Sequence, residues 1–280
     1  MAEVLSFYSV APSQGKRTLS LSFAEMLAEQ QHRVLYVELD YKHPSVAIAT
    51  QITHNTKNAV EYFQESVMKK TFALEPFVLS KDDLLINSDQ KLKRIYSRLP
   101  SKLEYLVLPL NFHENSFPSI ISDVNNAEQQ AQEFIQKFIY SLKSSKYHYI
   151  VLNLPNELQS VFGFEVISNS DQVINVVTPS ANRIYEFKKI EAFLSKNIPD
   201  FDSKFSTVIN MANPSISDEE YNQLLRSDLI VHYDSERQLE ELSLRPGSEQ
   251  IMQQLELLAI HLNISVTLTM AKKKPFFSRR

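Results

Sequence analysis

The stretch from Val4 to Val46 constrains the fold more than any other, because it places two apolar runs, a short loop and a helix-length segment in one order. The first apolar run, Val4 to Tyr8, leads into a loop that ends with Gly15 and Lys16. A segment with apolar residues at helical spacing follows, and the second apolar run covers Val34 to Val37. This order predicts a β-loop-α-β unit whose loop and helix start can hold an anion.

Gly15 and Lys16 match the end of the pattern G-x-x-x-x-G-K-[ST], in which backbone N–H groups and a lysine bind phosphate oxygens. The rest of this pattern is altered. Val10 stands at the first glycine position, Arg17 stands where a hydroxyl would bind Mg²⁺, and Thr18 follows one residue late. We therefore expect a loop that binds phosphate but is poorly suited to binding phosphate together with magnesium.

The loop and the strand after it resemble the MinD/ParA group of P-loop ATPases, which includes the ATPase domains of bacterial tyrosine kinases. Residues 11–18 align with the group's K-G-G-V-G-K-T-T loop, and the lysine that reaches across a dimer in that group is Ala11 here. The strand sequence RVLYVELDYKHPS resembles the group's RVLLIDADLRxPS, with Glu38 and Asp40 at the two acidic positions. The resemblance implies a homodimer closed around nucleotide, which the change at Ala11 puts in question.

Two further strands carry the resemblance. The run Tyr149 to Pro155 resembles the group's YDYIIIDTPPG, and the aspartate that arranges magnesium and water is Asn153 here. An amide cannot give a metal the charge that a carboxylate gives. Together with Arg17, this change predicts loss of efficient hydrolysis. The strand Phe205 to Met211 corresponds to the one whose asparagine contacts adenine, so Asn210 is a candidate for nucleotide binding.

Strands and helices alternate along the chain, which predicts an α/β fold with a mostly parallel sheet, helices on both faces and MinD/ParA-like P-loop architecture. Further strands are expected at Leu84–Ile86 (short), Leu103–Leu110, Asp171–Thr178 and Leu229–Tyr233, and further helices at Asn58–Met68, Asp89–Leu99, Ala127–Ser144, Pro179–Leu194 and Ser248–Asn263. We expect one domain over residues 1–265 with an insertion around 111–126, followed by a tail over 266–280.

Composition excludes several classes of function. The chain has no cysteine, so disulfides, thiolate metal sites and cysteine nucleophiles are excluded, and its seven histidines show no ligand spacing such as H-E-x-x-H. We therefore expect no metal site built from these residues. The balance of 29 basic and 33 acidic residues argues against general nucleic-acid binding. No apolar run approaches the roughly 20 residues that span a bilayer, and a cytoplasmic location is expected.

The C-terminal tail AKKKPFFSRR is basic and aromatic. Its candidate binding residues are Lys272, Lys273, Lys274, Phe276, Phe277, Arg279 and Arg280. Such a segment suits an anionic membrane surface, where each cation contributes on the order of 1 kcal/mol, or an acidic partner. It therefore predicts peripheral contact with the inner face of the cell membrane, with a merely solvated tail as the alternative.

Three functions are consistent with these observations. The first is a degenerate MinD/ParA-like protein that retains ATP or ADP through Gly15, Lys16, Arg17 and Thr18 and serves as a scaffold for protein partners in a membrane or surface machine. Tad-type pilus assembly proteins with altered loops (TadZ/CpaE-like) are the specific version of this hypothesis. The second is an active ATPase, used in partition, positioning or tyrosine phosphorylation, in which Asp40 and Glu38 replace the lost metal ligands. The third is an adaptor without a nucleotide site.

Overall fold

The computed structural model describes residues 1–121, 124–235 and 248–268. Within them the chain builds one seven-stranded sheet with all neighbouring strands parallel, in the order β3-β2-β4-β1-β5-β6-β7. The strands are β1 Glu3–Tyr8, β2 Val34–Glu38, β3 Leu103–Leu106, β4 Tyr149–Asn153, β5 Gln172–Val177, β6 Phe205–Ala212 and β7 Leu229–His232. The predicted parallel sheet is therefore confirmed.

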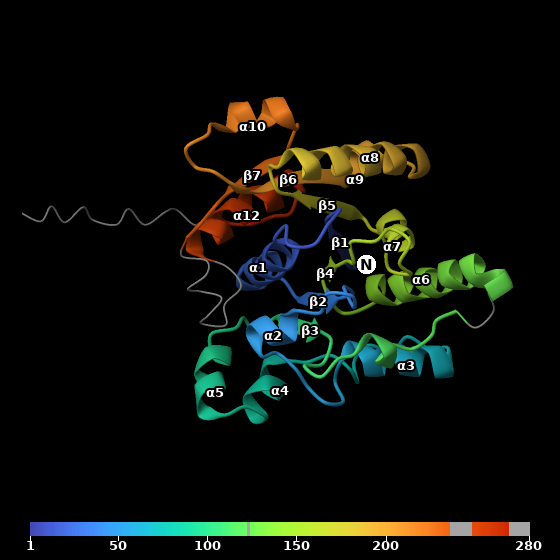
Figure 1. The fold of residues 1–280 in the computed structure, drawn as a ribbon. Helices are drawn as coiled ribbons and strands as arrows, with labels where there is room; N and C mark the ends of the chain where they lie inside the picture. The colour runs from blue at the N-terminus through green and yellow to red at the C-terminus, as the bar shows by residue number, and fades with distance from the viewer. Residues whose placement is uncertain (122–123, 236–247, 269–280) are drawn as a thin grey trace, which may run out of the picture.

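Helices cover both faces of this sheet (Figure 1). Helices α1 (Lys16–Glu29) and α12 (Glu249–His261) pack together on one face, and α6 (Ala127–Lys143) and α7 (Phe164–Asn169) pack together on the other. The remaining described α-helices are α2 Val46–Thr50, α3 Ala59–Lys69, α4 Lys81–Ile86, α5 Gln90–Tyr96, α8 Ala181–Asn197, α9 Phe201–Lys204 and α10 Asp218–Leu224. This layering confirms the predicted α/β class.

Strand β1 shows why these sequences form buried parallel strands. Leu5 and Phe7 pack in the core beneath α1 and α12, whereas Val4 and Tyr8 pack in the core beneath α6 and α7. A parallel sheet with helices on both faces needs apolar side chains on both faces. An uninterrupted apolar run, rather than an alternating one, therefore marks the central strand.

The strand order gathers the loops that form the site. Strand β1 lies between β4 and β5, and β2 lies beside β4. Because all of these strands are parallel, the loops that follow them emerge at one edge of the sheet, which is where open α/β sheets bind ligands. The loops that begin at Ser9, Leu39 and Leu154 meet at this edge.

Two expectations about elements are wrong. Leu84–Ile86 belongs to helix α4 and not to a strand, because Ser80 and Asp83 form a capping box that starts a helix. The strand expected over Leu103–Leu110 ends at Leu106. The insertion expected around 111–126 contains two short 3₁₀ turns, Glu114–Ser116 and Val124–Asn126, and the short helices α2, α7, α9 and α10 were not expected.

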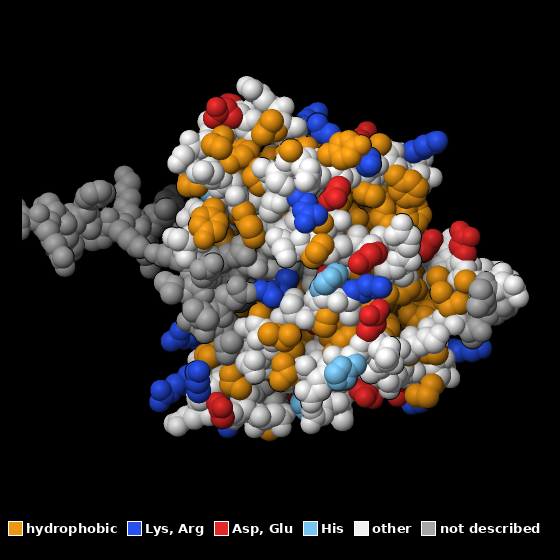
Figure 2. Space-filling model, in the orientation of Figure 1, with side chains coloured by type: hydrophobic (Ala, Val, Ile, Leu, Met, Phe, Trp, Pro, Cys, Tyr) orange, Lys and Arg blue, Asp and Glu red, His pale blue; other side chains and the backbone are white. Residues whose placement is uncertain are grey.

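Two other predictions concern the surface: that the protein is not a general nucleic-acid binder, and that it contacts a membrane. On the face drawn in Figure 2, acidic and basic side chains of the described residues are interspersed, and neither sign forms a continuous patch. Among the described helices, none has the length and apolar character needed to cross a bilayer. The basic tail from Lys272 to Arg280 lies outside the described residues, so its membrane contact stays a prediction.

Candidate functional site

The loop between β1 and α1 has the shape that binds an anion. Gly15 precedes the helix with a φ of 83°, and Ser13 has a φ of 64°, so the chain turns sharply before α1 begins. The backbone N–H groups of residues 13–16 and of Thr18 find no acceptor among the residues that the structure describes. Unpaired N–H groups at a helix start attract phosphate and carboxylate groups.

Gly15 is required for a second, steric reason. A Cβ atom at this position would lie 2.1 Å from Asn210 Nδ2, which is too close for any side chain. Asn210 is 1% exposed, and its amide nitrogen donates to the Gln14 carbonyl at 2.8 Å. The side chain of Asn210 therefore packs against the loop and holds it.

Gln14 supports the loop from the inside, and nothing in the sequence pattern singled it out. Its side-chain oxygen accepts the Thr178 backbone N–H at 2.9 Å, and its side-chain nitrogen donates to the Ala11 carbonyl at 3.3 Å. The first bond ties the loop to the end of β5, and the second lies within the loop. A glutamine in a loop has no distinctive local signal, because its partners lie elsewhere in the chain.

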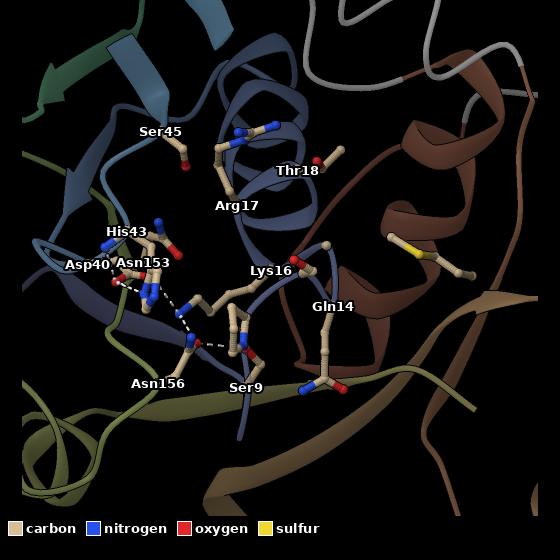
Figure 3. A pocket seen from close by; sticks show the side chains of 14 residues that line it. Ser9, Gln14, Lys16, Arg17, Thr18, Asp40, His43, Ser45, Asn153 and Asn156 are labelled. Carbon is tan, nitrogen blue, oxygen red and sulfur yellow. Dashed lines mark hydrogen bonds and ion pairs between the residues drawn. The ribbon is translucent and has the colours of Figure 1, made fainter. Parts of the chain in front are cut away.

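Lys16 lies at the centre of the site, and its side chain is 6% exposed. Its Nζ atom lies 3.1 Å from Asp40 Oδ2 and 2.8 Å from Asn156 Oδ1, and it also donates to the Leu154 carbonyl (Figure 3). Burial lowers the pKa of Lys16, while the charge and the hydrogen bond of Asp40 act in the opposite direction. A buried cation with three acceptors is thus held beneath the loop.

These residues surround a cavity of about 370 Å³. The described residues that line it are Ser9, Pro12, Ser13, Gln14, Gly15, Lys16, Arg17, Thr18, Asp40, His43, Ser45, Asn153, Asn156 and Met211. The structure therefore brings Gly15, Lys16, Arg17, Thr18 and Asp40 together around one cavity. Glu38 and Asn210 are not in the lining, although Met211, the residue after Asn210, is.

Both carboxylate oxygens of Glu38 accept hydrogen bonds from backbone N–H groups. One carboxylate oxygen accepts the N–H groups of Ser45 and Val46, and the other accepts the N–H group of Leu108, each at 3.0 Å. Burial raises the pKa of Glu38, while these three donors lower it. The side chain is 1% exposed and joins the end of β2 to the start of α2 and to the segment after β3. Its position is that of a structural anchor, away from the cavity.

Asn153 is the last residue of β4 and Asn156 lies three residues beyond it, and both line the cavity. Asn153 is 1% exposed, and its Oδ1 atom is buried without a partner among the described residues. Asn156 is 7% exposed; its Oδ1 atom accepts from Lys16 and from Ser9, and its Nδ2 atom is buried without a described partner. The sequence pattern pointed to Asn153 but not to Asn156.

The residues present fit a phosphate group. The loop supplies unpaired N–H groups, and Lys16 supplies a positive charge. Asp40 is the one carboxylate among the described lining residues, and it pairs with Lys16 and accepts the His43 backbone N–H at 3.2 Å. Across the described ranges, no group of three or more histidine or acidic side chains is placed to bind a metal.

Several solved structures with the same architecture are MinD or plasmid partition proteins. A plasmid partition protein from Borrelia burgdorferi bound to AMPPNP has a TM-score of 0.64 at 18% identity, with 94% of this chain and 99% of that chain covered. MinD from Pyrococcus horikoshii with Mg-ADP has a TM-score of 0.65 at 16% identity, with 94% and 96% covered. This chain has the MinD/ParA fold. A MinC:MinD complex from Aquifex aeolicus also matches, with a TM-score of 0.63 at 15% identity and 96% and 99% covered.

In this chain the cavity lies at the loop that follows β1, the middle strand of the sheet. The likeness covers nearly the whole chain, so the predicted α/β fold with MinD/ParA-like architecture is confirmed. No protein-family model matches the sequence, and no curated protein matches it either. At these identities the MinD/ParA fold is kept while most side chains differ.

Proposed function

We propose that the protein binds a nucleotide, ATP or ADP, in this cavity and acts as a positioning or assembly scaffold with little or no hydrolysis. The observation that carries the proposal is the buried Lys16 beneath a loop whose N–H groups have no described acceptor. The cavity of about 370 Å³ lies within the size range of small-molecule sites. AMPPNP and Mg-ADP in the Borrelia and Pyrococcus proteins support the choice of a nucleotide.

The proposal of weak hydrolysis and of magnesium-independent binding rests on two side chains. Arg17 and Asn153 both line the cavity, at positions where a hydroxyl and a carboxylate would help to hold Mg²⁺. A guanidinium group supplies positive charge directly and cannot ligate a metal cation. The cation and the amide therefore favour binding of phosphate itself over binding of a phosphate–metal pair.

An active ATPase with Glu38 and Asp40 as replacement metal ligands is less well supported. Both oxygens of Glu38 already accept backbone N–H groups, so turning this side chain toward the cavity would leave three buried donors unpaired. Asp40 lines the cavity and is 5% exposed, so it alone retains a possible role at the reacting phosphate. One carboxylate that is already paired with Lys16 is a poor basis for metal-dependent hydrolysis.

Thermal unfolding with ATP, with ADP and without nucleotide, each in magnesium and in EDTA, tests this proposal. A ligand that binds only the folded state stabilises it by about 2.7 kcal/mol at 100 times its Kd. We expect nucleotide to raise Tm in EDTA as much as in magnesium, with no phosphate release above background. A shift that requires magnesium would favour the active ATPase, and no shift in any buffer would favour the nucleotide-free adaptor.

We also propose that the scaffold serves protein partners of a membrane or surface machine, such as Tad-type pilus assembly, and that a homodimer is its working form. The Aquifex MinD in complex with MinC supports the idea of a protein partner. The peripheral membrane location rests on the basic, aromatic sequence of the tail.

Flotation with lipid vesicles tests the location. We expect the full chain to float with vesicles of phosphatidylglycerol and phosphatidylcholine at low salt, and to stay in solution with phosphatidylcholine alone, because the attraction is electrostatic. Deleting residues 271–280 should abolish flotation while the nucleotide-dependent Tm is kept. Equal flotation of the full and shortened chains would contradict a role of the tail.

A further inference from the structure

Asn156 occupies a position between the phosphate-binding lysine and the loop. Its Oδ1 atom accepts from Lys16 Nζ at 2.8 Å and from Ser9 Oγ at 3.1 Å. Ser9 in turn donates to the Ala11 carbonyl at 3.0 Å, within the loop itself. Two donors on one oxygen fix which end of the amide faces Lys16, so the amide nitrogen must point the other way.

The amide nitrogen of Asn156 is a buried donor that has no acceptor in the described part of the chain. Less than 1 Å² of it is exposed, and no described residue accepts its hydrogens. An unpaired buried donor destabilises the folded state, so folded proteins rarely keep one without a use. Asn153, which lines the same cavity, also has an unpartnered buried amide atom. Beside the Lys16–Asp40 pair, the floor of the cavity therefore carries two amide groups with hydrogen-bonding capacity that the described residues do not use.

The position of this donor indicates which part of a nucleotide it would meet. The loop lies on the β1 side of the cavity, and the N–H groups of residues 13–16 and of Thr18, which have no described acceptor, lie at the start of α1. Asn156 lies across from them, beyond the end of β4 and past the tip of Lys16 (Figure 3). A nucleotide whose inner phosphates were held by the loop and whose outer phosphates were held by Lys16 would have its outermost phosphate on the Asn156 side of the cavity.

We propose that Asn156 recognises the outermost phosphate of a nucleoside triphosphate, with its Nδ2 atom donating to a phosphoryl oxygen while its Oδ1 atom positions Lys16. This inference rests on the proposed nucleotide site and adds a residue that selects triphosphate over diphosphate. A phosphoryl oxygen only accepts hydrogen bonds, so an amide nitrogen is a suitable partner and a carboxylate at the same place would repel it.

Titration calorimetry of ATP and ADP in EDTA tests this role with Asn156→Asp. The variant has the same shape and keeps an acceptor for Lys16 and Ser9, but it replaces the donor with a negative charge. We expect the affinity for ATP to fall at least tenfold and the affinity for ADP to change less than threefold. Asn55→Asp, at an exposed site outside the cavity, makes the same change of charge and should leave both affinities unchanged.

Asn156→Ala provides a second variant in case the aspartate disturbs folding, because Lys16 keeps its contacts with Asp40 and Leu154. Here the ratio of ATP to ADP affinity should fall at least fivefold. If Asn156 had a purely structural role, its replacement would weaken the binding of ATP and ADP equally. An unchanged ratio of ATP to ADP affinity in both variants would overturn the inference and leave the proposed nucleotide site intact. If the unmodified protein binds neither nucleotide, the proposed function and this inference fail together.

Discussion

Replacing Lys16 with alanine is expected to remove most of the stabilisation that nucleotide gives to this protein. Lys16 is the buried cation beneath the loop, so its loss should weaken nucleotide binding at least 100-fold. At a nucleotide concentration 100 times the original Kd, the stabilisation should fall from about 2.7 to about 0.4 kcal/mol. Thermal unfolding with and without ATP in EDTA measures this difference directly.

The same substitution also changes the stability of the fold without nucleotide. The Tm with ATP must therefore be compared with the Tm of the same variant without ATP. Without Lys16 the carboxylate of Asp40, which is 5% exposed, loses its cation, and breaking a buried pair in this way costs about 3–5 kcal/mol. Lys16→Gln keeps a hydrogen-bond donor near Asp40 and serves as a milder variant. Lys189→Ala, at an exposed lysine on α8, is the matched control. A nucleotide-dependent shift that survives in both Lys16 variants would place the ligand elsewhere.

Replacing Glu38 with alanine is expected to lower the free energy of unfolding by about 3–5 kcal/mol, because three buried backbone donors lose a charged acceptor at once. The loss should be a stability effect on the whole domain, since Glu38 joins β2 to the segments that precede α2 and follow β3. Urea unfolding monitored by circular dichroism measures it through the midpoint and the slope.

Glu38→Gln separates the lost hydrogen bonds from the lost side-chain volume. The glutamine has nearly the same shape and one oxygen acceptor, but its amide nitrogen must face at least one backbone donor. We expect a loss of about 2 kcal/mol, smaller than that of the alanine variant. If the free energies of unfolding of both variants lie within about 0.5 kcal/mol of that of the original protein, the anchoring role of Glu38 is wrong.

The sequence was sufficient for those parts of the molecule that depend on local pattern. The β1-loop-α1-β2 unit could be predicted because the apolar runs and the Gly15–Lys16 pair lie within 46 residues, and each run is buried on both faces of the sheet. Helix α4 was missed although its start carries a local signal, the capping box of Ser80 and Asp83. Short apolar runs such as Leu84–Ile86 fit strand and helix alike, so this signal has to decide between them.

Tertiary structure decided what the polar residues do. Glu38 and Asp40 are two residues apart and looked equivalent in the sequence, yet one accepts backbone N–H groups from residues up to 70 positions away and the other pairs with Lys16. Asn156 meets Ser9 across 147 positions of the chain. Local propensity determines where strands and helices form, but the partner of a buried polar group is whichever donor or acceptor the packed sheet brings within about 3 Å. These partners come together only when the sheet has formed, so the sequence alone does not identify them.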